Sequence, residues 1–338
     1  MHLGALPPAF AGLDVADSQE AASYLQSFAM EAGDLLMEQG EEDYTLAFIV
    51  SGAVQYKDGA TRIGGATTRD MIGELELFGQ LPRTATVEAT APTHLLVLAY
   101  EHWLELCERG NPAVFNIERF AYRRLSERLR WLSEGIADRS TGGEPPPPPP
   151  SSGLMSALSG LFSGGTPRLS PADVLARSPM FGWADPSLLE DIGRSFQVER
   201  FHPRTPLCRQ GQVGEKAYLL VEGDVDVMVE VNRHAVERLA TIGPGQAIGD
   251  STLAANAPRP LSCVCNGEVV ALSLHRNDFG ALFASDDAAG SVFRQSMLRN
   301  LVLTVLAVQQ RFVELERVVD ARNEAELRGT PVNAVWRD

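Results

Sequence analysis

The sequence predicts a mainly β protein with flanking helices, built as two β-barrel or jelly-roll domains in tandem. Short strand-like runs separated by turn residues are typical of these all-β architectures. The second half of the chain repeats the motifs of the first half in the same order, which indicates duplication of a whole domain. The 338 residues are enough for two domains that each bury their own core.

The first half begins with an acidic, alanine-rich stretch, in which we expect a helix over residues 18–30 with Ser18 as its N-cap. From residue 33 the pattern changes to short strands, and Asp58-Gly59 is a hairpin signal. The expected strands cover residues 45–50, 53–57, 84–88 and 94–99. After residue 100 the apolar period becomes helical, which predicts one helix over residues 101–109 and another that begins at Asn111-Pro112.

The long helix after Pro112 has one apolar side and carries five arginines: Arg119, Arg123, Arg124, Arg128 and Arg130. Such a stripe is either a binding surface or a solvated helix face. Glu118 and Glu127 are interleaved with it and the whole chain is acidic, so we favour the solvated face.

The second half starts with Ser170-Pro171, an N-cap followed by proline at the first helical position, and Asp185-Pro186 repeats this device. The expected strands cover residues 196–201, 217–221, 225–231 and 236–241. The expected helices cover residues 188–195, residues 277–283 and a stretch from residue 288 onward, which we expect to extend as an interaction helix through the charged residues 314–326.

A proline-rich linker joins the halves. Six prolines at positions 145–150 predict a stiff, extended spacer. The following residues 154–162 have apolar residues at helical spacing, which fits a segment that docks on a partner or a membrane surface, a short helix on its own domain, or a disordered segment. The segment is short, so we favour the last two over docking. We therefore expect a domain over residues 1–138, the linker over 139–168, a second domain over 169–318 and a C-terminal tail over 319–338.

The composition disfavours several classes of function. The net charge of −15 argues against a general nucleic-acid binder, because affinity for phosphate backbones comes mostly from Lys and Arg. Neither half is followed by a helix-turn-helix pattern, and no apolar run is long enough to span a membrane. Four scattered cysteines do not make a disulfide framework. We expect a cytoplasmic protein with no membrane insertion.

Residues 71–87 contain the most informative motif. Gly73 permits a tight turn and a close ligand, and a short helical turn after it would present free N–H groups to an anion. Arg83 follows Glu74 by nine positions, and its guanidinium can bind two phosphate oxygens. A carboxylate, N–H donors and an arginine in one loop suit a small ligand with one phosphate and a nearby hydroxyl. In the second half, Asp250 and Arg259 keep the nine-residue spacing.

This stretch resembles the phosphate-binding cassette of the cyclic nucleotide-binding domain family. The matching residues are Gly73, Glu74, Leu75, Leu77, Pro82, Arg83, Thr84 and Ala85. The resemblance implies two eight-stranded jelly rolls that bind cAMP or cGMP, with Glu74 on the ribose 2′-hydroxyl and Arg83 on the cyclic phosphate. It also implies that the final helix of each domain is a lid over the purine. Glu76 departs from the family, which has a small residue there.

The expected ligand-binding residues of the first domain are Ile72, Gly73, Glu74, Leu75, Arg83, Thr84 and Ala85. We expect a second, weaker site formed by Gly249, Asp250, Ser251, Arg259, Pro260 and Leu261. Three substitutions weaken it: Asp250 is shorter than Glu74, Pro260 has no N–H for a phosphate, and Leu261 adds bulk where the first copy has Ala85.

The sequence thus favours a cyclic-nucleotide sensor that acts through an unidentified protein partner and has neither catalytic nor DNA-binding output. A ligand-free scaffold that keeps the fold is the alternative. A cupin-type metalloenzyme would need clustered histidine ligands. The six histidines are isolated, so we expect no enzyme and no metal: His2, His94, His102, His202, His234 and His275.

Overall fold

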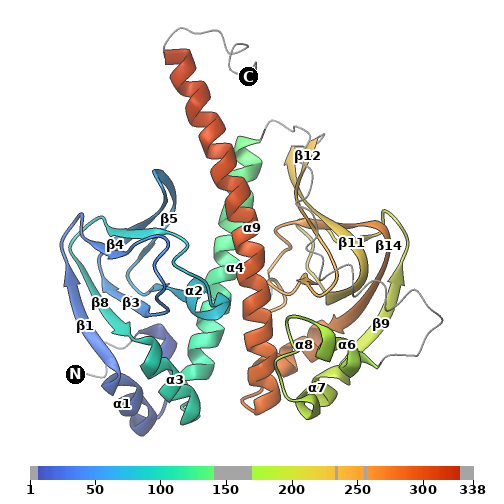
Figure 1. Ribbon diagram of the computed structural model, residues 1–338, viewed down its shortest axis with the longest axis horizontal. Coiled ribbons are helices and arrows are strands. Elements are labelled where there is room, and N and C mark those ends of the chain that lie inside the picture. Colours follow the sequence, from blue (N-terminus) through green and yellow to red (C-terminus); the bar gives the residue numbers. More distant parts are fainter. Residues whose placement is uncertain (1–6, 141–169, 233–234, 255–256, 328–338) are drawn as a thin grey trace.

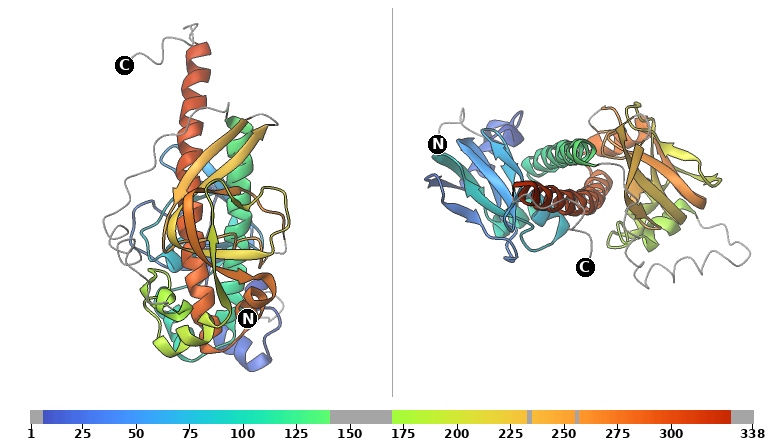
Figure 2. Two further views of the ribbon diagram at one scale, coloured as in Figure 1. Left: turned by 90° about the vertical axis from the view of Figure 1, so that its right-hand side faces the viewer. Right: turned by 90° about the horizontal axis from the view of Figure 1, so that it is seen from above.

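The computed structural model describes residues 7–140, 170–232, 235–254 and 257–327. Two β domains lie on either side of a central pair of long helices, α4 (Ala113–Arg139) and α9 (Ala288–Leu327) (Figure 1). The view from above shows the helix pair between the domains (Figure 2). This confirms the expected mainly β class with flanking helices and two tandem domains. The proline spacer, residues 154–162 and residues 328–338 lie outside the described residues.

The first domain contains eight strands in two four-stranded antiparallel sheets, with strand orders β1-β8-β3-β6 and β2-β7-β4-β5. The strands are β1 (Leu25–Met30), β2 (Leu35–Met37), β3 (Leu46–Ser51), β4 (Ala53–Asp58), β5 (Thr61–Thr67), β6 (Met71–Ile72), β7 (Thr86–Ala89) and β8 (Thr93–Leu98). The short helices are η2 (Pro8–Phe10), α1 (Val15–Ser23), α2 (Glu74–Gly79) and α3 (Tyr100–Glu108).

Alternation of apolar and polar residues places the core between the two sheets. In β4, Val54 and Tyr56 are buried while their neighbours are partly exposed. The expected hairpin at Asp58-Gly59 is confirmed: Asp58 pairs with Thr61, and Gly59 has a φ of +57°. The sequence period of two therefore fixed which residues face inward.

The helix expected over residues 18–30 is wrong in its second half. Helix α1 begins after Asp14, whose carboxylate accepts a hydrogen bond from the N–H of Asp17 at 2.8 Å, and it ends at Ser23. Residues 25–30 form strand β1, which pairs along its whole length with β8. Backbone pairing with a strand far along the chain overrides the local helical preference here.

The described residues of the second domain form one six-stranded sheet, not the eight strands that the resemblance implied, and two of its strands are long, with 17 and 14 residues. The strands are β9 (Phe196–Phe201), β10 (Pro206–Cys208), β11 (Lys216–Asn232), β12 (Ala235–Ile242), β13 (Ala247–Ile248) and β14 (Ser262–His275). The strands expected at residues 217–221 and 225–231 are a single irregular strand, β11. The helices are α6 (Pro171–Arg177), α7 (Pro186–Gly193) and α8 (Arg276–Ala284), and the expected Ser170 and Asp185 caps are confirmed.

The final helix of each domain packs against both domains. On α4, Glu118, Tyr122 and Leu129 recur on one face, while Arg124 and Arg128 lie on another. The helices approach closely at Gly135, where an added Cβ would lie 2.7 Å from Cε2 of Phe312. Helix α9 continues past residue 318, so the boundary expected there falls inside a helix. Within the described ranges, no helix combines the length and apolar character needed to cross a membrane.

Candidate functional site

The first candidate site is built around the turn into helix α2. Gly73 precedes this helix with a φ of +93°, and a Cβ there would lie 2.3 Å from the carbonyl oxygen of Thr45. Only glycine fits this position. The turn places Glu74 at the first position of α2, where its side chain is buried with 5% exposure.

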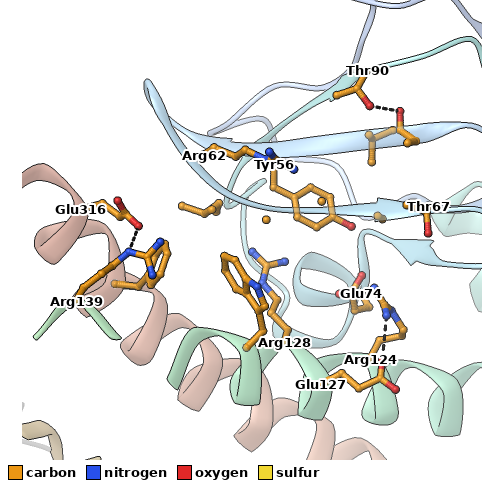
Figure 3. A pocket seen from close by; sticks show the side chains of 18 residues that line it. Tyr56, Arg62, Thr67, Glu74, Thr90, Arg124, Glu127, Arg128, Arg139 and Glu316 are labelled. Carbon is orange, nitrogen blue, oxygen red and sulfur yellow. Dashed lines mark hydrogen bonds and ion pairs between the residues drawn. The ribbon is translucent and has the colours of Figure 1, made fainter. Parts of the chain in front are cut away.

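Glu74 lies in the wall of a cavity of about 680 Å³ between the first β domain and the central helices (Figure 3). This volume is within the usual range for small-molecule pockets, roughly 300–1,000 Å³. Other side chains that line the cavity include Tyr56, Arg62 and Thr67 from the sheet, Arg124, Arg128 and Trp131 from α4, and Phe312 and Glu316 from α9.

Arginines of helix α4 lie near the buried Glu74. Burial raises the pKa of Glu74, and the nearby Arg128 opposes this shift. Arg128 stacks over the ring of Tyr56 at 5.1 Å, and Arg124 pairs with Asp70 at 3.2 Å. Interpreting the arginine stripe as a solvated face is therefore wrong for Arg124 and Arg128. Their four-residue spacing places them on the same face of the helix, and this pattern could have indicated that both face the β domain.

Arg83, the expected phosphate ligand, is bound by groups of the protein itself. Its side chain is 1% exposed, and its Nη2 donates to Asp43 Oδ2 at 2.5 Å and to the carbonyl oxygen of Thr45 at 2.9 Å. Its Nη1 donates to Glu76 Oε2 at 3.4 Å. The guanidinium is thus held by two carboxylates and one carbonyl group.

The other expected residues surround the same point. Thr84 donates both its backbone N–H and its hydroxyl to Glu76, while Ile72, Leu75 and Ala85 are buried beside it. Only a small cavity of about 20 Å³ remains, lined by residues that include Gly73, Glu74, Glu76, Thr84 and Ala85. The structure therefore brings all seven expected residues of the first site together, but Glu76 occupies the centre of the group.

The second cassette is also satisfied internally. Arg259 donates to the carbonyl oxygens of Gly249 and Lys216, the latter at 2.6 Å, and to the hydroxyl of Thr252 at 2.7 Å. Ser251 and Leu261 are buried and Pro260 is partly buried beside it. The cavity lined by Gly249, Asp250, Arg259, Pro260 and Leu261, among other residues, has a volume of only about 80 Å³.

Asp250 is bound by residues of both central helices. Its Oδ2 accepts a 2.8 Å hydrogen bond from the hydroxyl of Tyr122 on α4 and a longer one, 3.5 Å, from Nδ2 of Asn300 on α9. Burial raises the pKa of Asp250, and the hydrogen bond from Tyr122 opposes this shift. Sequence reasoning missed Tyr122, because it belongs to the first domain and lies 128 positions from Asp250.

We expect Tyr122→Phe to lower the free energy of unfolding by about 1.5–3 kcal/mol, because the variant leaves a buried carboxylate without its strongest donor. Chemical denaturation of the full chain measures this. The double variant Tyr122→Phe/Asp250→Ala should lose less than the sum of the two single losses if the residues act as a pair. Strict additivity would contradict the assignment.

Comparison with known proteins agrees with this geometry. The cyclic nucleotide-binding domain model matches residues 28–110 and 198–286. A cyclic nucleotide-gated potassium channel of Mesorhizobium japonicum is 29% identical over 37% of this chain and 33% of its own length. A cAMP-dependent protein kinase regulatory subunit of Yarrowia lipolytica is 23% identical over 81% of this chain and 58% of its own length. The chain therefore spans about a third of the length of the channel and less than two thirds of the length of the kinase regulatory subunit.

Among solved structures, the regulatory domain of Toxoplasma gondii PKA, crystallised with cAMP, is similar with a TM-score of 0.32 and 17% identity, covering 82% of this chain and 88% of that one. The two matched segments cover half of the sequence, one in each β domain. The chain belongs to the cyclic nucleotide-binding domain family and contains two such domains in tandem.

Proposed function

We propose that this protein is a cyclic-nucleotide sensor, for cAMP or cGMP, in which the first domain binds the ligand. The cavity of about 680 Å³ beside Glu74 is the main support for this proposal. Its wall contains both the buried Glu74 carboxylate, which can accept a hydrogen bond from a ribose hydroxyl, and residues of helix α4. Trp131 and Tyr56 supply aromatic surface for a base. The site residues are those expected from the sequence, extended by Arg124 and Arg128 of α4.

The second domain has a structural role in this proposal. Its cavity of about 80 Å³ is far smaller than a typical ligand pocket, and Tyr122 already takes the carboxylate of Asp250. The second cassette thus fixes the lid helix of the first domain. The domains are proposed to extend over residues 1–138 and 169–318, joined by the linker, and residues 319–327 continue the last helix of the second domain.

The output is proposed to be contact with another protein in the cytoplasm, without catalysis, metal or nucleic-acid binding. The four cysteines are all free thiols, which suits a reducing compartment. Helices α4 and α9 contact both domains, so a ligand that moves the lid changes surfaces on either side of it. The alternative is a scaffold of the same fold that binds no ligand.

Isothermal titration of the full chain with cAMP and cGMP distinguishes the sensor from the scaffold. Heat that saturates with either ligand supports the sensor. If the wild type and the Glu76→Ala variant both give no heat with either ligand, the protein is the scaffold. Pull-down with and without ligand then identifies a partner whose binding depends on occupancy.

We expect Glu74→Ala to weaken ligand binding by about 1.5–3 kcal/mol, the usual value for a hydrogen bond to a charged group. The measurement is titration of the full chain. Asp250→Asn is the matched control, since it changes the equivalent acid of the second domain and keeps an acceptor for Tyr122. Its effect on the affinity should be far smaller than that of Glu74→Ala, because it can act on the first site only through α4. Equal losses in the two variants would contradict the assignment of the site to the first domain.

A further inference from the structure

The Glu76 carboxylate occupies the position at which the first cassette would receive a phosphate. Three donors converge on it: the Thr84 N–H at 2.9 Å and the Thr84 hydroxyl at 2.8 Å reach Oε1, and Arg83 Nη1 reaches Oε2 at 3.4 Å. A backbone N–H, a hydroxyl and a guanidinium are the groups that bind phosphate oxygens. The donor set is thus already bound to an anion of the protein.

The available space leads to the same conclusion. Beside Gly73, Glu76 and Thr84 the free volume is about 20 Å³, enough for about one water molecule but not for a phosphate. The neighbouring cavity has a volume of about 680 Å³ and shares Glu74, Tyr56 and Arg128 with the small one. The site therefore has room for a base and a sugar, while the phosphate position is filled.

Arg83 keeps one donor free. Among the described residues, the buried Nε of Arg83 has no hydrogen-bond partner, so the guanidinium is not saturated by Asp43, Glu76 and Thr45. An incoming phosphate can take over the contact that Glu76 makes with Nη1. The arginine is thus competent to bind an anionic ligand once Glu76 leaves.

We propose that Glu76 is a built-in competitor for the phosphate of the ligand. A cyclic nucleotide binds the first site only by expelling the Glu76 carboxylate, whereas an uncharged nucleoside binds in the large cavity without displacing it. This refines the ligand specificity of the proposed sensor and rests on that function. It makes Glu76 the residue that sets the affinity for cyclic nucleotides relative to nucleosides.

The test titrates the full chain with cAMP, cGMP, adenosine and guanosine. In the wild type, the cyclic nucleotide is expected to bind no more tightly than its nucleoside, because the gain from Arg83 is offset by expulsion of Glu76. Glu76→Ala removes the competitor and opens the small cavity. It should tighten cyclic-nucleotide binding about 10- to 100-fold, the equivalent of a hydrogen bond to a charged group, and leave nucleoside binding unchanged.

Two further variants test whether the gain comes from removing the Glu76 side chain, from the change in charge, or from altered folding. Glu76→Gln keeps the size of the side chain, so its folding is the least disturbed, and it should give a smaller gain of the same sign. Asp43→Asn is the matched control: it removes another carboxylate from Arg83 but leaves Glu76 in place. Its effect on the ratio of cyclic nucleotide to nucleoside affinity should be far smaller than that of Glu76→Ala.

The outcomes distinguish this inference from the proposed function. If the wild type binds a cyclic nucleotide much more tightly than the nucleoside and Glu76→Ala does not tighten it, the competitor role is wrong while the sensor remains. If none of the four ligands binds to the wild type, Glu76→Gln or Glu76→Ala, both the sensor and the competitor are wrong. If Asp43→Asn tightened cyclic-nucleotide binding as much as Glu76→Ala, the gain would come from the loss of a negative charge and not from the removal of a competitor.

Discussion

Glu118→Ala is expected to lower the free energy of unfolding by about 3–5 kcal/mol, since it leaves the buried Arg294 without its countercharge. Glu118 is fully buried on α4, and its Oε2 accepts from Arg294 Nε at 2.7 Å across the central helix pair. Gln295 donates to the other oxygen at 3.0 Å, and Arg294 also stacks on Phe115 at 4.5 Å. Burial raises the pKa of Glu118, and Arg294 opposes the shift.

The matched control is Glu105→Ala, which removes a carboxylate from an exposed pair with Arg109 four residues away on the surface. Exposed pairs contribute only about 0–1 kcal/mol, so this variant should unfold close to the wild type. Chemical denaturation of both variants, followed by circular dichroism, measures the difference. If Glu118→Ala and Glu105→Ala unfold at the same denaturant concentration, the ion pair between the helices is not a major source of stability.

In the Glu76→Ala background, Arg83→Ala is expected to weaken cyclic-nucleotide binding by about 2–5 kcal/mol, as for loss of one partner of a buried charge pair. In the wild type background the substitution also leaves the buried Glu76 without a cation. The cleaner comparison is therefore Glu76→Ala against Glu76→Ala/Arg83→Ala, in which no carboxylate is left opposite the missing guanidinium.

Titration with cAMP and adenosine provides the control within this pair. Adenosine has no phosphate, so its affinity should not change when Arg83 is removed, and cAMP should fall to the level of adenosine. In the same background, Arg83→Lys should bind cAMP with an affinity between those of the protein that keeps Arg83 and the Arg83→Ala variant. Lysine keeps the positive charge but lacks the planar guanidinium. If cAMP binding survives Arg83→Ala undiminished, the phosphate position lies elsewhere.

The parts of the site that depend on local sequence were predictable. Gly73, Glu74 and Arg83 lie within eleven positions. A turn followed by a short helix brings them together without contacts from distant segments. The Asp58-Gly59 hairpin and the Ser170 and Asp185 caps were predictable for the same reason. These features depend on the conformations that individual residues allow.

The features that sequence reasoning missed depend on contacts between distant segments. Residues 25–30 form a strand only because β8 pairs with them. The role of Tyr122 requires knowing that α4 faces the second domain, which no local pattern encodes. Glu76 was visible as a departure from the family pattern. That its side chain turns back to Thr84 depends on rotamer and packing, which the sequence does not specify.

Helix α4 contacts both cassettes. Arg124, in the wall of the first cavity, and Tyr122, bound to Asp250, are two positions apart and project from opposite sides of the same helix. A ligand that displaces the helix at Arg124 displaces Tyr122 by nearly the same distance. The Tyr122–Asp250 hydrogen bond is 2.8 Å long, and lengthening by about 1 Å would break it. In the proposed sensor, a ligand that moved α4 this far would release a buried carboxylate in the second domain.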